Sequence, residues 1–180
     1  MGGEESYGYL VGDHIRDKDA VVSCLMFAEM AAHYKQMGKS LYDVLIEIYE
    51  TYGFYRERLI SVKREGKKGA EEIAQMMEDF RTEPPLAFAD RKVVVVKDYQ
   101  TGRQRDLRTG KETDLGLPSS NVLQFVTEEE DVISVRPSGT EPKIKFYLSV
   151  KSELAKGESY RETVHRMDKL LDKMASDLNA

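Results

Sequence analysis

Two apolar, strand-like segments, 131–135 and 144–150, enclose a polar run that reads Arg-Pro-Ser-Gly-Thr-Glu-Pro-Lys. A polar run between two such segments predicts a strand–loop–strand unit, and prolines at both ends of the loop stiffen it. A stiff loop loses little freedom when a ligand arrives, so this composition is compatible with a binding loop. On the residues alone, a plain surface turn is the favoured interpretation.

The side chains of this loop are suited to an anion such as phosphate. A guanidinium presents a planar fork of donors that matches phosphate oxygens. Two hydroxyl groups add further donors, and a glycine lets backbone N–H groups turn toward one point and form a concave nest. The candidate phosphate-binding residues are therefore Arg136, Ser138, Gly139 and Thr140.

Composition narrows the class of protein. The chain has 180 residues and a net charge of −5, so a general nucleic-acid surface is not expected. No apolar run approaches the roughly 20 residues of a membrane helix, and the N-terminus does not resemble a signal peptide.

The single cysteine, Cys24, excludes an internal disulfide, and its apolar helical surroundings predict a core residue. Three scattered histidines leave no zinc constellation, and we expect a cytoplasmic protein.

The apolar periodicity divides the chain at about residue 53. Residues 1–53 carry two helical patterns, one from Asp19 as N-cap to Gly38 and one from Ser40 to Gly53. Residues 54–180 read as an α+β domain with a mostly antiparallel sheet and two helices on one face. We expect a glycine- and lysine-rich turn at 66–69. The polar segment 101–116 reads as a solvated loop or hairpin. The expected strands are 59–63, 93–99, 121–126, 132–135 and 144–150, and the expected helices begin after Gly69 and near Glu158.

The loop motif also resembles that of a known family. Arg-Pro-Ser-Gly-Thr-Glu-Pro, followed by Lys145 and Tyr147, is similar to the phosphate-binding loop of the α-D-phosphohexomutases, which include phosphoglucomutases and phosphomannomutases. The loop lies in the last of the four domains of that family, whose fold resembles the TATA-box-binding protein. The resemblance assigns the phosphate to the loop, and we expect Lys145 and Tyr147 to support the loop rather than bind the ligand.

A second match lies at residues 2–19, where Gly-Gly-Glu-Glu-Ser-Tyr resembles the sugar-binding loop of the third domain, closest to the glucomutase-like branch. Glu4 could accept sugar hydroxyls and Ser6 could donate and accept, although solvated surface acids would read the same way. The resemblance further implies substrate contacts for Lys18 and His14. The helices that follow would be the end of the third α/β domain, without the sheet that they normally cover.

The resemblance implies an enzyme that interconverts hexose 1-phosphate and hexose 6-phosphate through a phosphoserine and a bisphosphorylated sugar. The family's Ser-His-Asn-Pro nucleophile motif and its aspartate triplet for magnesium do not occur in these residues. We therefore expect the substrate-binding part of a phosphoglucomutase-like enzyme, inactive alone, whose magnesium is held by other domains.

Two further interpretations remain open at this stage. The chain could be a stand-alone phosphosugar-binding or regulatory module, or an interaction domain whose loop is only a turn. If the chain is the substrate-binding part of a longer enzyme, its apolar N-terminal helices lack their sheet and would leave large exposed patches, which monomers seldom carry. We therefore expect the N-terminal helices to pack against another copy or against the C-terminal domain.

Overall fold

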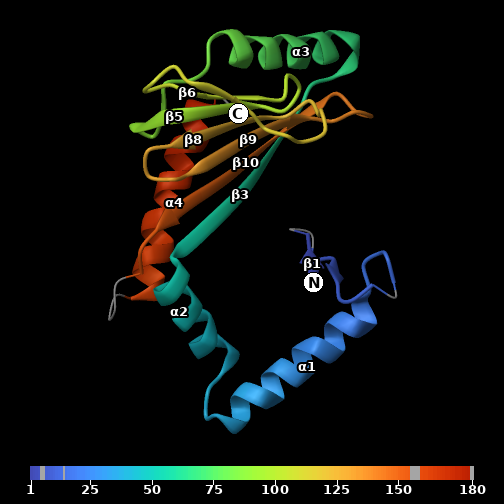
Figure 1. Cartoon of the computed structure of the whole chain (residues 1–180), viewed down its shortest axis with the longest axis vertical. Helices are drawn as coiled ribbons and strands as arrows, with labels where there is room; N and C mark the ends of the chain where they lie inside the picture. The colour runs from blue at the N-terminus through green and yellow to red at the C-terminus, as the bar shows by residue number, and fades with distance from the viewer. Residues whose placement is uncertain (5–6, 14, 155–158, 179–180) are drawn as a thin grey trace. The chain divides into compact units, whose positions relative to one another are not determined.

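The computed structural model describes residues 1–4, 7–13, 15–154 and 159–178. The chain divides into two compact units, Met1–Tyr52 (unit 1) and Gly53–Ala180 (unit 2), coloured in sequence order in Figure 1. None of the helices formed by the described residues combines the length and apolar character that a bilayer crossing requires.

Unit 1 consists of two helices and a very short hairpin. Its elements are β1 (Gly2–Gly3), β2 (Tyr9–Leu10), α1 (Ala20–Gln36) and α2 (Leu41–Tyr52). Asp19 caps α1 as predicted, because its Oδ1 accepts hydrogen bonds from the N–H groups of Val21 and Val22 at 2.9 and 3.2 Å. The helix ends two residues before Gly38, whose φ of +73° suits glycine after a helix end.

Cys24 is exposed, so the prediction of a core cysteine is wrong. The reason is that no residue of α1 is buried, although the helix is rich in apolar side chains. An apolar helical pattern shows what a helix could bury, whereas burial itself requires a packing partner. Within unit 1, the described residues supply no such partner for most of α1.

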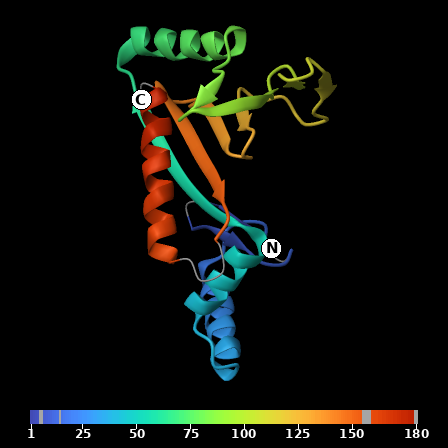
Figure 2. The ribbon, with the colours of Figure 1, turned by 90° about the vertical axis from the view of Figure 1, so that its left-hand side faces the viewer.

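Unit 2 is built on an antiparallel sheet with the strand order β3-β10-β9-β8-β5-β6-β7, and β4 pairs with β5. The strands are β3 (Phe54–Lys63), β4 (Ala87–Phe88), β5 (Arg91–Asp98), β6 (Arg103–Asp106), β7 (Glu112–Asp114), β8 (Leu123–Thr127), β9 (Val132–Pro137) and β10 (Lys143–Ser152). The β6–β7 pair forms a hairpin that extends from the rest of the sheet in Figure 2, in agreement with the hairpin interpretation of 101–116.

The helices α3 (Gly66–Thr82) and α4 (Tyr160–Asp177) pack on one face of this sheet. The ring of Phe80 in α3 lies 5.9 Å from that of Phe125 and 6.3 Å from that of Phe146. Met167, Leu171 and Met174 of α4 are fully buried, and Figure 2 shows α4 running alongside β3 and β10. The predicted α+β class, with two helices on one face of an antiparallel sheet, is confirmed. The opposite face of the sheet carries no helix from the described residues and is called the open face below.

The expected turn at 66–69 is wrong, because α3 already begins at Gly66. Gly69 is buried in the first turn of this helix, and a Cβ there would lie 2.6 Å from backbone and side-chain atoms of Arg64. The glycine therefore permits a close approach to the preceding chain rather than a turn. Similarly, β3 starts at Phe54, five residues before the expected strand.

A buried ion pair ties several strands of unit 2 together. Asp131 is fully buried, and its two carboxylate oxygens accept hydrogen bonds from Arg91 at 2.6 and 2.7 Å. The carboxylate also accepts bonds from the Thr127 hydroxyl and from the Lys151 N–H, each at 3.0 Å. Because all partners are in place, the cost of burying this charge is offset, and the β8–β9 turn is fixed against β5 and β10.

Candidate functional site

The predicted phosphate loop connects β9 and β10 and is closed by its own hydrogen bonds. The N–H of Ser138 donates to the carbonyl of Lys143 at 2.8 Å. The Ser138 hydroxyl oxygen accepts bonds from the N–H groups of Thr140 and Glu141 at 3.4 and 3.3 Å. The N–H of Arg64 also donates to the carbonyl of Pro142 at 2.9 Å, which attaches the loop to the chain that leads into α3.

Gly139 has a different role from the one we expect from sequence. Its φ does not lie in the left-handed region, and a Cβ added there would meet nothing within 4 Å. The glycine is therefore not needed to turn this backbone. It instead keeps the tip of the loop free of a side chain, so that a ligand could approach the backbone closely.

Arg136 and Lys145 lie directly opposite each other on β9 and β10. Their neighbours Val135, Ile144 and Phe146 are fully buried beneath the helices, so the alternation of a strand turns both cationic side chains to the open face. No carboxylate of the described residues lies within ion-pair distance of either cation. Two like charges in directly opposed positions repel each other, and a bound anion would remove that repulsion.

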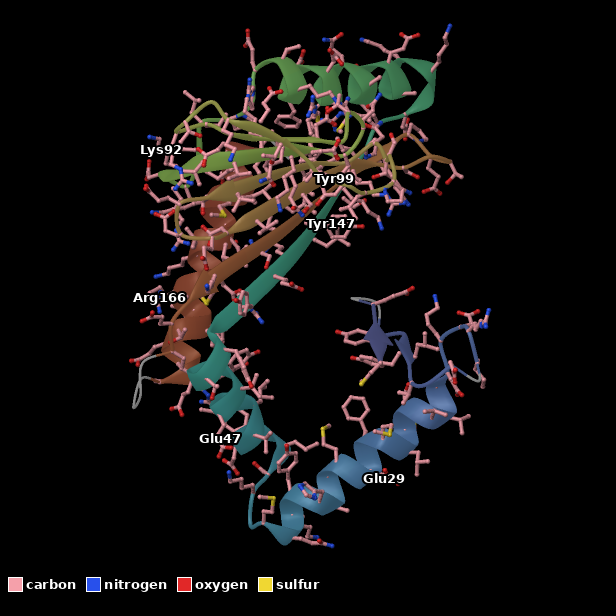
Figure 3. All side chains as sticks on the ribbon, in the orientation of Figure 1. Glu29, Glu47, Lys92, Tyr99, Tyr147 and Arg166 are labelled. Carbon is pink, nitrogen blue, oxygen red and sulfur yellow. The ribbon has the colours of Figure 1, made fainter. Side chains whose placement is uncertain are left out.

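Sequence reasoning missed this pairing, because it assigned Lys145 a supporting role. Strand register decides which residues face each other, and the loop sequence alone does not reveal the register. Tyr147, labelled in Figure 3, lies next to this pair on the open face, and the Lys145 ammonium is 5.9 Å from the centre of its ring. The tyrosine therefore helps to position the lysine.

Ser138, Gly139 and Thr140, the predicted phosphate-binding residues other than Arg136, line a pocket of about 620 Å³ on the helix side of the loop. Its floor is formed by α3, including Ile73 and Met77, and Asn121 contributes from the segment before β8. Arg136 is not among the lining residues, in agreement with its position on the open face. The full lining consists of Gly66, Ala70, Ile73, Ala74, Met77, Asn121 and residues 137–142.

The rim of this loop carries one acidic side chain, that of Glu141. Glu141 forms an ion pair of 2.5 Å with Lys143. The hydrogen bond from Lys143, supported by its charge, lowers the pKa of the Glu141 carboxyl. Lys143 is thereby paired with a carboxylate, whereas Arg136 and Lys145 form no ion pair with the described residues.

In unit 1, the structure brings Glu4 and Lys18 together. The Lys18 ammonium donates to Glu4 Oε2 at 3.3 Å, and the loop between them is held by a bond of 2.8 Å from the N–H of Glu4 to the carbonyl of Gly8. Gly8 was missed by the sequence analysis. A Cβ at this position would lie 2.2 Å from Cδ of Lys18, so only glycine lets the lysine stem cross the loop and reach Glu4.

A small hollow of about 260 Å³ surrounds this ion pair. It is lined by Gly2, Gly3, Glu4, Gly8, Leu10, Arg16, Asp17 and Lys18. The predicted sugar-binding Ser6 and the predicted contact His14 lie outside the described residues. Of the four residues predicted for unit 1, Glu4 and Lys18 thus line the same hollow. Arg16 and Asp17 contribute further charged groups to its lining.

The carboxylates of this segment do not fit a magnesium site. Asp19 is occupied as the cap of α1, and Asp17 Oδ1 accepts the N–H of Lys18 at 2.7 Å. Among the residues that the structure describes, no group of three or more histidine, cysteine, aspartate or glutamate side chains is arranged to hold a metal ion. We therefore derive no step through a metal in this chain.

Two family models match the sequence over nearly its whole length. The model of the phosphoglucomutase/phosphomannomutase α/β/α domain III matches residues 1–52, and that of the phosphoglucomutase/phosphomannomutase C-terminal domain matches residues 59–166. The chain belongs to the phosphoglucomutase/phosphomannomutase family. The order of the two matched domains is the order expected from the two sequence motifs.

Individual members of this family are also similar to the chain in sequence. A phosphoglucomutase of Staphylococcus haemolyticus (strain JCSC1435) is 40% identical over 147 residues, which are 82% of this chain and 27% of the relative. A phosphoglucomutase of Staphylococcus aureus (strain bovine RF122 / ET3-1) is 40% identical over 148 residues, again 82% of this chain and 27% of the relative. The chain thus spans about a quarter of the length of these curated relatives.

A solved structure supports the fold. The open form of the exocytosis-sensitive phosphoprotein pp63/parafusin, a phosphoglucomutase from Paramecium, superimposes with a TM-score of 0.59 at 18% sequence identity. The likeness covers 97% of this chain and 29% of that structure. At this identity the similarity concerns the fold and not the ligand.

Proposed function

We propose that this chain forms the substrate-binding portion of a phosphoglucomutase-like enzyme that interconverts hexose 1-phosphate and hexose 6-phosphate. Unit 2 would hold the phosphate that is not transferred, and unit 1 would bind hydroxyl groups of the sugar. The observation that carries the proposal is the opposed pair Arg136 and Lys145 beside the Ser138–Thr140 loop, both without an ion-pair partner in the described chain.

The chemistry of this pair fits a phosphate dianion. The guanidinium can donate two parallel hydrogen bonds to phosphate oxygens, and the ammonium adds a second positive charge from the neighbouring strand. Each charge-assisted hydrogen bond contributes about 1.5–3 kcal/mol. Binding also relieves the repulsion between the two cations, so the free protein carries a small electrostatic cost that the ligand removes.

The Ser138 hydroxyl can add a directed hydrogen bond. Its oxygen already accepts the N–H groups of Thr140 and Glu141, which orients the group within the loop. The hydroxyl hydrogen then remains to be donated to a phosphate oxygen. This division of roles explains why a serine suits the position better than a second basic residue would.

In unit 1, Glu4 would accept hydrogen bonds from sugar hydroxyls while Lys18 holds the carboxylate in place. A carboxylate offers several acceptor positions on its two oxygens, so its ion pair with a lysine is compatible with hydrogen bonds to sugar hydroxyls. The ion pair is largely exposed, with side-chain exposures of 54% for Lys18 and 49% for Glu4, so it is accessible to a sugar. We propose Ser6 and His14 as further contacts on the strength of the sequence motif.

The transfer step would need groups that these residues do not contain. The sequence lacks the Ser-His-Asn-Pro nucleophile motif and the aspartate triplet for magnesium, and we propose that other domains of the protein supply both. The 180-residue chain should therefore show no conversion of glucose 1-phosphate. Turnover above that of a mock purification would contradict this part of the proposal.

Titration calorimetry with glucose 6-phosphate on the 180-residue chain tests the phosphate site. We expect Arg136→Ala to weaken binding by about tenfold or more, and Lys145→Ala to have a comparable effect, because each removes a charged donor. The matched control is Lys151→Ala, since Lys151 lies on the same strand and face but is paired with Glu130. Equal affinities of Arg136→Ala and of the unmodified chain would refute the assignment.

A further inference from the structure

Strand β3 forms an open edge of the unit 2 sheet. It pairs with β10 on one side, and on its other side it pairs with no strand of the described residues. With ten residues, β3 is also long, because most strands have about five or six. A long edge offers a row of unpaired backbone N–H and C=O groups, which serves as a template for another strand.

The side chains of this edge do not prevent such pairing. On the open face, Tyr55 and Leu59 are each 45% exposed, which leaves two large apolar groups in contact with water. On the helix face, Arg56 and Arg58 are held by Asp168 and Asp172 of α4. Two of the four charged side chains of β3 are therefore neutralised within the chain, and Glu57 and Lys63 remain on the open face.

We propose that a second copy of this chain pairs with β3, edge to edge and antiparallel, about a twofold axis that lies midway between the two Leu59 residues. The two copies would then share one continuous sheet. The pairing places Leu59 against Leu59 of the partner subunit, Tyr55 against Lys63 of the partner subunit, and Glu57 against Ser61 of the partner subunit. This arrangement buries the exposed leucine and places the lysine ammonium beside a tyrosine ring.

The choice of axis follows from the register rules of a sheet. Opposed residues must share a face, so a twofold axis perpendicular to the sheet lies midway between the two copies of one residue on the neighbouring strands. An axis at Arg58 would place two guanidinium groups opposite each other. An axis at Ile60 would pair only seven residues, 57–63, whereas the axis at Leu59 pairs nine residues, 55–63, within β3.

The helices also allow this assembly. Helix α4 packs over both β3 and β10. Because neighbouring strands are about 4.8 Å apart, the two copies of α4 would lie about 10 Å from each other across the axis. That separation is close to the 8–10 Å typical of packed helices, so the helices would pack against each other without a steric clash.

Disulfide trapping tests the register. In a Cys24→Ser background, which removes the exposed native thiol, we expect Leu59→Cys to form a covalent dimer on mild oxidation, because opposed Cβ atoms lie about 4.5–5.5 Å apart. Glu57→Cys and Ser61→Cys should each form no covalent dimer alone but should crosslink when the two variants are mixed. Failure of Leu59→Cys to crosslink, or equal crosslinking by Glu57→Cys alone, would overturn the proposal.

A second experiment separates this surface from the apolar helix of unit 1. Leu59→Lys places two ammonium groups opposite each other, and in sedimentation equilibrium it should shift the chain from dimer to monomer. Leu25→Lys, at a position in α1 that is 57% exposed, is the matched control and should remain dimeric. Circular dichroism verifies that both variants fold. A monomeric unmodified chain, or dissociation by Leu25→Lys and not by Leu59→Lys, would exclude the β3 edge as the interface.

Discussion

Units 1 and 2 differ most in what their apolar side chains contact. In unit 2, two helices and a sheet enclose a core in which Phe125 and Leu171 have no exposed surface. In unit 1, Val44 is the only buried side chain among the described residues, whereas Phe27 is 49% exposed in α1. The comparison shows that an apolar helix gains stability from its packing partner, and that its sequence alone does not indicate whether a partner is present.

Truncation of one phenylalanine in each unit should give the largest difference. We expect Phe125→Ala to lower the free energy of unfolding of unit 2 by about 4 kcal/mol, because it removes a fully buried ring and leaves a cavity. Phe27→Ala should change the free energy of unfolding of unit 1 by less than about 0.5 kcal/mol, as for most exposed sites. Urea unfolding followed by circular dichroism measures both. A loss for Phe27→Ala as large as for Phe125→Ala would show that unit 1 has a core of its own.

Removal of the buried carboxylate of unit 2 should have the next largest effect. We expect Asp131→Ala to destabilise unit 2 by about 3 kcal/mol, because Arg91 then loses its partner and the Lys151 N–H loses its acceptor. Glu129→Ala, at an exposed position in the same turn, is the matched control and should be near neutral. Equal midpoints of urea unfolding for the two variants would contradict the structural role of this ion pair.

Gly8→Ala tests unit 1 without affecting the core of unit 2. The added methyl group would collide with the Lys18 stem and separate the lysine from Glu4. We expect binding of glucose 6-phosphate to weaken several-fold, while binding of inorganic phosphate, which depends on unit 2, stays the same. Gly2→Ala is the control, because a Cβ there meets nothing within 4 Å. If Gly8→Ala and Gly2→Ala bind glucose 6-phosphate equally well, the Glu4–Lys18 pair does not contact the sugar.

The smallest effect concerns the exposed hairpin of unit 2. The hydrogen bond from Arg108 lowers the pKa of Asp106 from its usual 3.8 to about 2. Because the pKa in the folded chain is depressed, the interaction stabilises the hairpin above pH 4 and is lost as the pH falls toward 2. A carboxyl carbon titration by NMR should show this midpoint, and Arg108→Ala should return it toward the usual value. An unchanged midpoint in Arg108→Ala would exclude this cause.

The sequence predicted most elements of unit 2 well, because β-branched runs are local signals. It did not predict contacts that depend on tertiary packing. The sequence favours a turn at Gly69 because it does not reveal the close approach to Arg64, and it favours a buried Cys24 because the apolar pattern carries no information on a packing partner. Likewise, the opposition of Arg136 and Lys145 depends on the register of two strands separated by a loop.

We propose above all that unit 2 by itself holds phosphate, at the Arg136–Lys145 pair and the loop beside it. A titration of the isotopically labelled chain with inorganic phosphate, followed by amide NMR shifts, tests it most directly. The account predicts saturable shifts at residues 136 and 138–141 and at Lys145, with none in residues 1–52. Saturable shifts confined to residues 1–52, or no shift in the loop at millimolar phosphate, would contradict it.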